Sequence, residues 1–317
     1  METQNKIKIA IAGIGGIGGY IGGKLAHYYN NGDDVHISFI CRGEHLKAIK
    51  ENGLELISNN QPLICHPHLV SNNPSEIGNL EVLIICTKNF ALKELLVSYA
   101  ECITPHTVII TTQNTISGNE TITPLLPKET TLLEGAIYIA SNIISPGKIN
   151  HVSGPSKLFF GTNGLDDVKG KFIAEILNKA GIDATFTTNI NSVLWKKFMF
   201  VSPAAIVTAL YKITIPAIIQ NYEPRTLYTA LISELMLLAK AKEIEIDKDT
   251  IANNCKLLEN FAPTVKSSFQ LDLEKNKRTE INFLIHYVIA ESKKHGLPAN
   301  NYKHALEEIS EQYELHY

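Results

Sequence analysis

The fold of this chain is decided near its start, by the stretch KIAIAGIGGIG at residues 8–18. The apolar run from Ile7 to Ala12 predicts a buried strand that leads directly into Gly13, Gly15 and Gly18. This is the G-x-G-x-x-G pattern between a strand and a helix, where the glycines allow a tight turn, a close approach of pyrophosphate and close helix packing. The N–H groups and dipole of the helix start also favour phosphate. The stretch predicts a dinucleotide site, and its alternative is a glycine-rich turn without a ligand.

The end of the second predicted strand indicates which dinucleotide is bound. The segment from His36 to Gly43 reads HISFICRG, so the strand ends at Arg42, with no acidic residue before Glu44. An acidic residue there would suit the ribose of NAD, and a basic one suits the additional phosphate of NADP. A guanidinium offers paired donors to a phosphate. We therefore expect Arg42 to contact the 2′-phosphate of NADPH, the alternative being a solvated loop arginine.

Composition and charge exclude several classes of protein. The 317 residues are 44% hydrophobic and 19% charged, with a net charge of −3, which is ordinary for a soluble protein of two domains. Nothing indicates a nucleic-acid or anionic-membrane binder. No uninterrupted apolar run approaches the ~20 residues of a membrane span, and the N-terminus lacks the features of a signal peptide.

Cysteine and histidine spacing gives no sign of a metal or disulfide. Five scattered cysteines without a CxxC pair predict reduced thiols in a cytoplasmic protein. Cys41 and Cys86 follow strands near the expected cofactor site but lack a partnered base. His66 and His68 flank a proline in an expected loop, so no metal site is predicted.

The pattern of the chain predicts an α/β fold, with an N-terminal Rossmann-type parallel sheet domain followed by an all-helical C-terminal domain. We place the NADP-binding domain at residues 1–187 and the helical substrate and catalytic domain at 188–317. Continuous apolar runs at 82–86 and 108–112 are typical of parallel strands covered on both faces. The segments 148–152 and 157–161 are expected to form an antiparallel pair around a turn at Ser153-Gly-Pro.

Beyond Asn189 the apolar spacing becomes helical, for example at Leu227, Leu231, Leu235 and Leu238. These amphipathic helices are compatible with a homodimer and equally with a core of the domain's own. We expect the site in the crevice between the two domains.

Several polar residues stand where ligands bind in such folds. Lys88 and Asn114 each follow a predicted parallel strand, at the edge where open α/β sheets bind ligands. Lys197 lies with Val193 and Val201 on one stripe of a predicted helix. Its amine either extends to solvent or points into a cleft, where burial would lower its pKa for acid–base work. Lys196 beside it is the competitor.

Two further residues are weak candidates when read alone. Glu280 opens an apolar helix, where a carboxylate is favourable for electrostatic reasons alone. Ser268 could be a loop or cap residue.

Taken together, the motifs resemble the ketopantoate reductase (2-dehydropantoate 2-reductase) family over nearly the whole chain. The resemblance is carried by the glycine loop, Cys41-Arg-Gly, Thr87-Lys88, Gln113-Asn114, Leu194-Trp-Lys-Lys197, and Ser267-Ser-Phe-Gln-Leu-Asp272 followed by Arg278-Thr-Glu280. It implies that Lys197 is the catalytic acid and that Glu280 assists it. It also implies that Ser268 and Asn114 bind substrate, and that Lys88 and Asn114 face the cofactor.

The sequence departs from the family pattern at identifiable positions. Val201 and Ala205 stand where the family often has substrate-facing asparagines, and His286 replaces a usual glycine. The residues at four further positions, Thr115, Phe269, Leu271 and Asn282, also differ from those usual in the family.

The resemblance implies NADPH-dependent reduction of a small 2-oxo acid, 2-dehydropantoate, to (R)-pantoate for pantothenate and coenzyme A biosynthesis. Three alternatives stay open: a reductase of another 2-oxo acid, a hydroxy-acid dehydrogenase working oxidatively, and a non-catalytic NADP-binding sensor.

Overall fold

The computed structural model describes residues 6–32, 34–117, 120 and 122–316. The chain divides into two compact units. The first holds residues 1–113 and 118–190, and the second holds 114–117 and 191–317. Each unit has its own hydrophobic core.

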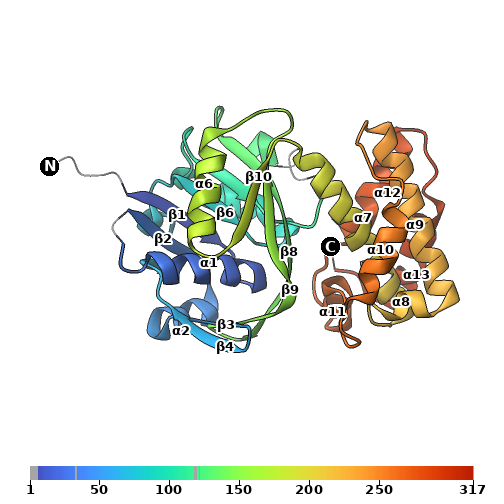
Figure 1. Cartoon of the computed structure of the whole chain (residues 1–317), viewed down its shortest axis with the longest axis horizontal. Coiled ribbons are helices and arrows are strands. Elements are labelled where there is room, and N and C mark those ends of the chain that lie inside the picture. Colours follow the sequence, from blue (N-terminus) through green and yellow to red (C-terminus); the bar gives the residue numbers. More distant parts are fainter. Residues whose placement is uncertain (1–5, 33, 118–119, 121, 317) are drawn as a thin grey trace. The chain divides into compact units, whose positions relative to one another are not determined.

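The first unit is built on a parallel sheet with strand order β5-β2-β1-β6-β7-β8 (Figure 1). Its strands are β1 (Ile7–Ala12), β2 (Val35–Ile40), β5 (Leu69–Ser71), β6 (Val82–Ile85), β7 (Val108–Thr111) and β8 (Thr131–Ser145). Chain order reverses between β1 and β6, which is the switch point where such sheets bind ligands at their carboxyl ends. All four residues of β6 and of β7 are buried, because helices cover both faces.

Side chains of β1 alternate between two cores. Ile9 and Ile11 pack with helices α1 (Gly16–Tyr29) and α6 (Val168–Lys179), which lie on the same face of the sheet. Ala10 and Ala12 pack on the other face, with α3 (Pro74–Ile77) and α4 (Leu92–Ser98). The remaining short helices of this unit are α2 (Gly43–Asn52), η1 (Asn89–Ala91), η2 (Ala100–Cys102) and η3 (Thr123–Leu125).

The expected turn at Ser153-Gly-Pro is wrong. Residues Lys148–Gly161 form one long strand, β9, which pairs antiparallel with β8. Between the pairs Ala140–Ser153 and Tyr138–Lys157, β9 contributes more residues than β8, so the segment is a bulge. Gly154 (φ +100°) supplies the left-handed backbone, and Pro155 lies between the two pairs, with no β8 residue paired to it. Turn residues here mark a bulge instead of a reversal.

Three strands had no counterpart in the sequence analysis. They are β5, given above, and the hairpin of β3 (Leu54–Ser58) and β4 (Gln61–Cys65). Asn59 and Asn60 both have positive φ (52° and 60°), the backbone of a two-residue hairpin turn, so the Asn-Asn pair was the available signal. The edge is completed by β9 beside β3, with β10 (Asp183–Thr187) also paired to β9.

The second unit is helical apart from its connecting segments, which confirms the predicted fold class. Its helices are α7 (Ile190–Tyr211), α8 (Ala217–Gln220), α9 (Tyr222–Ala241), α10 (Thr250–Glu259), α11 (Ser268–Glu274), the π-helix η4 (Asn282–His286), α12 (Tyr287–Lys294) and α13 (Asn300–Gln312). Its core includes the fully buried side chains of Tyr228 and Tyr302.

Helix α7 is the central helix of this core. By length and composition it could cross a membrane, with a mean hydropathy of 1.4, but 78% of its most apolar window is buried by the rest of the protein. Pro203 lies inside it and has no N–H to offer the carbonyl of Met199. The side-chain amide of Asn254, on α10, donates to that carbonyl instead, at 3.2 Å. A neighbouring helix thus completes the hydrogen bonding that the proline interrupts.

Replacing Asn254 with Ala should lower the free energy of unfolding by about 1–3 kcal/mol, because a buried carbonyl is left without a donor. In a Pro203→Ala background the same change should matter less, since residue 203 regains its N–H. Urea denaturation of the four proteins of this cycle measures both effects. Equal losses in the two backgrounds would contradict the explanation.

Candidate functional site

The glycine turn after β1 is built so tightly that three of its positions, Gly13, Gly16 and Gly18, admit no side chain. Gly13 has a φ of +90°, and a Cβ there would lie 2.7 Å from Cγ2 and 2.9 Å from the backbone nitrogen of Thr87. A Cβ on Gly18 would overlap the carbonyl oxygen of Gly13. The turn and the helix therefore press against each other and against the end of β6.

Gly15 differs from these positions because a Cβ there would meet no atom within 4 Å. It directly precedes α1, and no side chain of the described residues caps that helix start. The helix N-terminus, with its unpaired N–H groups, thus begins at a residue beside which a side chain's first carbon would meet no other atom. Such a cradle fits the pyrophosphate of a dinucleotide.

The exits of β2 and β6 carry the two predicted basic residues. Arg42 precedes α2, and its side chain is 82% exposed, 3.8 Å from the carboxylate of Glu94. An exposed pair at this distance contributes little stability, so the guanidinium can exchange Glu94 for a phosphate at small cost. Lys88 precedes η1 and is half-buried.

Gln113 is a site residue to which the sequence analysis gave no role. Its side-chain amide donates to the carbonyls of Ile85 (3.1 Å) and Thr87 (3.0 Å), and its Oε1 accepts from the N–H of Thr112 (3.2 Å). The buried amide therefore ties the exit of β7 to that of β6 and fixes the segment that carries Lys88. The signals in the sequence were a glutamine close behind a buried strand and its place in the Gln113-Asn114 motif.

The two adjacent lysines of α7 lie in opposite environments. Lys196 is exposed, whereas Lys197 is only 7% exposed. Burial lowers the pKa of Lys197 from 10.5 to about 8, and the negative charge of Glu280 opposes this shift. A buried amine that titrates near neutral pH can donate and recover a proton, which an exposed lysine does poorly.

Glu280 is buried at the start of the π-helix. Its side chain is 8% exposed, and its backbone carbonyl accepts from the N–H groups of Phe283 (2.9 Å) and Leu284 (3.0 Å). A single π turn in an α-helix is rare and frequently marks a functional site. The charge of Glu280 acts on Lys197 and raises its pKa. His286 ends the same π-helix, half-buried, and burial lowers its pKa.

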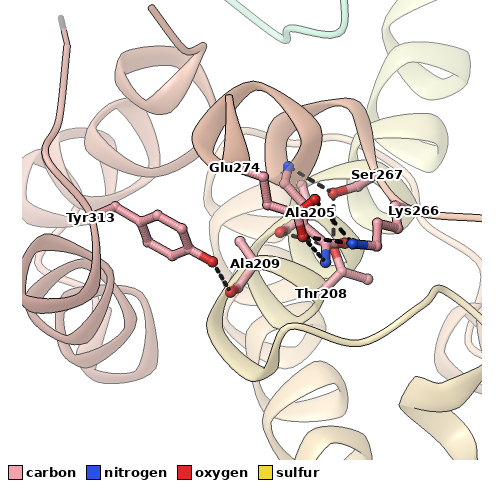
Figure 2. Close-up of polar contacts among 8 residues, drawn as sticks. Ala205, Thr208, Ala209, Lys266, Ser267, Glu274 and Tyr313 are labelled. Atoms are coloured by element: carbon pink, nitrogen blue, oxygen red, sulfur yellow. Dashed lines mark hydrogen bonds and ion pairs between the residues drawn. The ribbon is translucent and has the colours of Figure 1, made fainter. Parts of the chain in front are cut away.

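The two serines of the sequence motif, at the start of α11, have different surroundings, and Figure 2 shows those of Ser267. Ser267 caps the helix by accepting from the N–H of Gln270 (3.1 Å), and its hydroxyl lies 2.7 Å from that of Thr208 on α7. Thr208 donates to the carbonyl of Ala205 (3.2 Å), so Ser267 donates to Thr208. With Ser267 committed to structure, Ser268 is the exposed hydroxyl that remains for a ligand.

The predicted site residues fall into two groups. Those assigned to the cofactor, Gly13, Gly15, Gly18, Arg42 and Lys88, lie in the first unit.

Asn114 joins Lys197, Ser268 and Glu280 in the second unit, because the segment Asn114–Ser117 clusters there. Its residue Ile116 packs on the helical core. The chain therefore carries Asn114 from the sheet directly to the helical unit.

The described residues do not form a reactive-cysteine site or a metal site. Burial raises the pKa of Cys41 and of Cys86 to about 12, far from that of a thiolate nucleophile. All five cysteines are free. Within the described part of the chain, no group of three or more His, Cys, Asp or Glu side chains could hold a metal.

Comparisons with known proteins identify the family of the chain. Residues 9–164 match the family model described as ketopantoate reductase PanE/ApbA, and residues 189–312 match the model of that family's C-terminal part. The uncharacterized oxidoreductase YkpB of Bacillus subtilis is 26% identical over 294 residues, 92% of this chain and 94% of that protein.

Two crystal structures illustrate the range of the fold. That of 2-dehydropantoate 2-reductase from Porphyromonas gingivalis is 28% identical with a TM-score of 0.82, covering 96% of this chain and all of that one. The ternary structure of D-mandelate dehydrogenase with NADH and anilino(oxo)acetate is 22% identical with a TM-score of 0.83, covering 96% and 98%. The second likeness concerns the fold alone.

Proposed function

The chain belongs to the ketopantoate reductase PanE/ApbA family of oxidoreductases, and from this premise we propose that it reduces 2-dehydropantoate to (R)-pantoate with NADPH. The observation that carries the proposal is the buried amine of Lys197, whose pKa of about 8 is set by burial against the charge of Glu280. The reaction serves pantothenate and coenzyme A biosynthesis. We place it in the cytoplasm, in keeping with five free cysteines.

The first unit holds the cofactor in this proposal. The family is one of Rossmann-type nicotinamide-dependent reductases, and the bound nicotinamide supplies a hydride. The open turn at Gly15 receives the pyrophosphate, and Arg42 takes the 2′-phosphate through paired N–H donors. Lys88, whose segment is fixed by Gln113, contacts the cofactor from the exit of β6.

The second unit supplies the acid. Lys197, as an ammonium, polarises the ketone and gives its proton to the oxygen that becomes the hydroxyl. Glu280 keeps the amine oriented and favours its charged form. Ser268 donates a hydrogen bond to the substrate carboxylate, and Asn114 contacts substrate and nicotinamide.

A specific observation favours a second candidate, a reductase of a different 2-oxo acid. One and two turns beyond Lys197, α7 carries half-buried Val201 and buried Ala205, neither of which can hydrogen-bond a substrate hydroxyl. The 4-hydroxyl of 2-dehydropantoate would then lack a partner on this stripe, whereas an apolar substituent would fit. A same-fold enzyme named for another hydroxy acid, D-mandelate dehydrogenase, shows that the architecture accommodates such a change.

The lysine assignment is tested with two adjacent variants. Lys197→Ala should lower the turnover of NADPH with 2-dehydropantoate by ~10²–10⁴, the usual contribution of a positioned acid. Lys196→Ala, on the exposed neighbour, should retain activity within about twofold. In the wild type, kcat should fall as pH rises through about 8, because the proton donor is lost above its pKa. Survival of turnover in Lys197→Ala within a few-fold would refute the assignment.

The cofactor assignment predicts that a substitution of Arg42 changes KM for NADPH much more than KM for NADH. Arg42→Ala should raise KM for NADPH by about 10- to 100-fold, the loss of a charge-assisted hydrogen bond to phosphate. KM for NADH should change by less than about twofold, since NADH has no 2′-phosphate. Initial rates with both cofactors measure the difference, and an equal change in both would rule out this role for Arg42.

Two substrates that differ by one hydroxyl separate the candidate functions. We expect the kcat/KM ratio of 2-dehydropantoate to 3,3-dimethyl-2-oxobutanoate to lie within ~10² if no group binds the hydroxyl, and near 10⁴ if one does. In Val201→Asn the ratio should rise by about tenfold or more, because the amide supplies the missing partner. A ratio that already favours 2-dehydropantoate near 10⁴ would exclude the second candidate.

A further inference from the structure

Ser202 links the helix that carries Lys197 to the segment that carries Glu280. It lies on α7, five residues beyond Lys197, and is fully buried. Its hydroxyl donates to the backbone carbonyl of Leu284 at 2.9 Å. We propose that Ser202 is a positioning residue, which holds the Lys197 amine and the Glu280 carboxylate at their working separation. This inference rests on the proposed function and assigns Ser202 no contact with substrate or cofactor.

The link continues without a break to Glu280 itself. Leu284 lies in the π-helix, and its N–H donates to the carbonyl of Glu280 at 3.0 Å. The peptide groups of Leu284 thus receive the Ser202 hydroxyl on one side and hold the Glu280 backbone on the other. Because α7 is a continuous helix through Lys197 and Ser202, a displacement at Ser202 is passed to the separation of the two buried charges.

The other side of Ser202 is anchored as firmly. The Tyr302 hydroxyl lies 2.9 Å from that of Ser202, and Tyr302 is fully buried. Since a carbonyl can only accept, the Ser202 proton goes to Leu284, and Tyr302 must be the donor to Ser202. Burial raises the pKa of Tyr302, so its hydroxyl keeps this proton throughout the neutral range.

Tyr302 is held in turn by a buried carboxylate. Glu234, on α9, accepts from the backbone N–H groups of Asn301 (2.9 Å) and Tyr302 (3.2 Å) in the first turn of α13. The negative charge of a carboxylate is attracted to the positive end of the helix dipole at the N-terminus. The chain of hydrogen bonds therefore runs from α9 through α13 and α7 to the π-helix, and Ser202 is its middle member.

This arrangement has a consequence that packing alone does not have. Removing the Ser202 hydroxyl frees the π-helix to shift relative to α7, which weakens the interaction between Glu280 and the ammonium of Lys197. Because the Glu280 charge raises the pKa of Lys197, the pKa should fall below its wild-type value. A serine with only a structural role would affect the unfolding temperature and leave that titration unchanged.

The experiment follows the titration of Lys197 directly, by ¹³C NMR of the full chain labelled at lysine Cε. Lys197→Ala identifies the signal, and Glu280→Gln gives the shift that follows complete loss of the carboxylate charge. The test variant is Ser202→Ala. Its matched control is Ser292→Ala on α12, also a fully buried serine, whose hydroxyl has no hydrogen-bond partner among the described residues.

We expect the Lys197 midpoint to fall by about half a pH unit in Ser202→Ala, by about one or more in Glu280→Gln, and to stay unchanged in Ser292→Ala. With an active substrate, kcat of Ser202→Ala should fall by about 3- to 10-fold at constant KM for NADPH, because the cofactor residues lie in the first unit. A wild-type midpoint in Ser202→Ala would overturn the proposal.

A second variant serves if Ser202→Ala does not fold. Tyr302→Phe removes the donor to Ser202 and leaves the ring in place, so a smaller downward shift supports the proposal and an unchanged midpoint overturns it. Since the titration requires no turnover, its result stands apart from the proposed function, which fails if the wild type reduces no 2-oxo acid.

Discussion

The candidate site in the helical unit depends on one unfavourable event, the burial of the Lys197 amine. An ammonium loses much of its hydration there, and burial alone drives its pKa towards neutrality. The carboxylate of Glu280 recovers part of that loss, which leaves the amine with a pKa of about 8 in place of 10.5. The balance depends on the distance between Lys197, on α7, and Glu280, just before the π-helix. Rigid packing of α7 against the π-helix is therefore a condition of the site and not only of the fold.

In the first unit the constraint is different. Backbone N–H groups must come close to a charged ligand, so side chains must be absent at that point. Gly13 and Gly18 allow the turn to close on itself, while Gly15 leaves its outer side bare. Closely packed positions and an open one alternate in the same turn, because Gly16, next to Gly15, packs against the backbone of Ser141. Gln113 adds rigidity next to it by tying two strand exits together with one buried amide. The residues that face the cofactor in our proposal thus rest on backbone that has little freedom to move.

The sequence was most informative where the local structure permits only a few residue types. The glycine turn, the fully apolar strands β6 and β7, and a lysine in an apolar helical stripe each allow few interpretations. It was misleading at 153–155, because glycine and proline satisfy a bulge as well as a reversal, and only pairing with β8 decides between them.

The other features depend on contacts between residues far apart in the sequence, which local patterns do not reveal. The residues around Asn254 in the sequence do not indicate that its side chain donates to the carbonyl of Met199, which Pro203 leaves without a donor. Ser202 likewise reads as an ordinary helical serine until Leu284, 82 positions away, is seen to accept its proton. The same limit applies to substrate choice. In our proposal, Lys197 and Glu280 serve the reduction of 2-oxo acids as a class, whereas Val201 and Ala205 decide which member of the class fits. The proposal thus places the proton donor, Lys197, and the residues that select the substrate, Val201 and Ala205, on the same helix, α7, at positions that can be substituted separately.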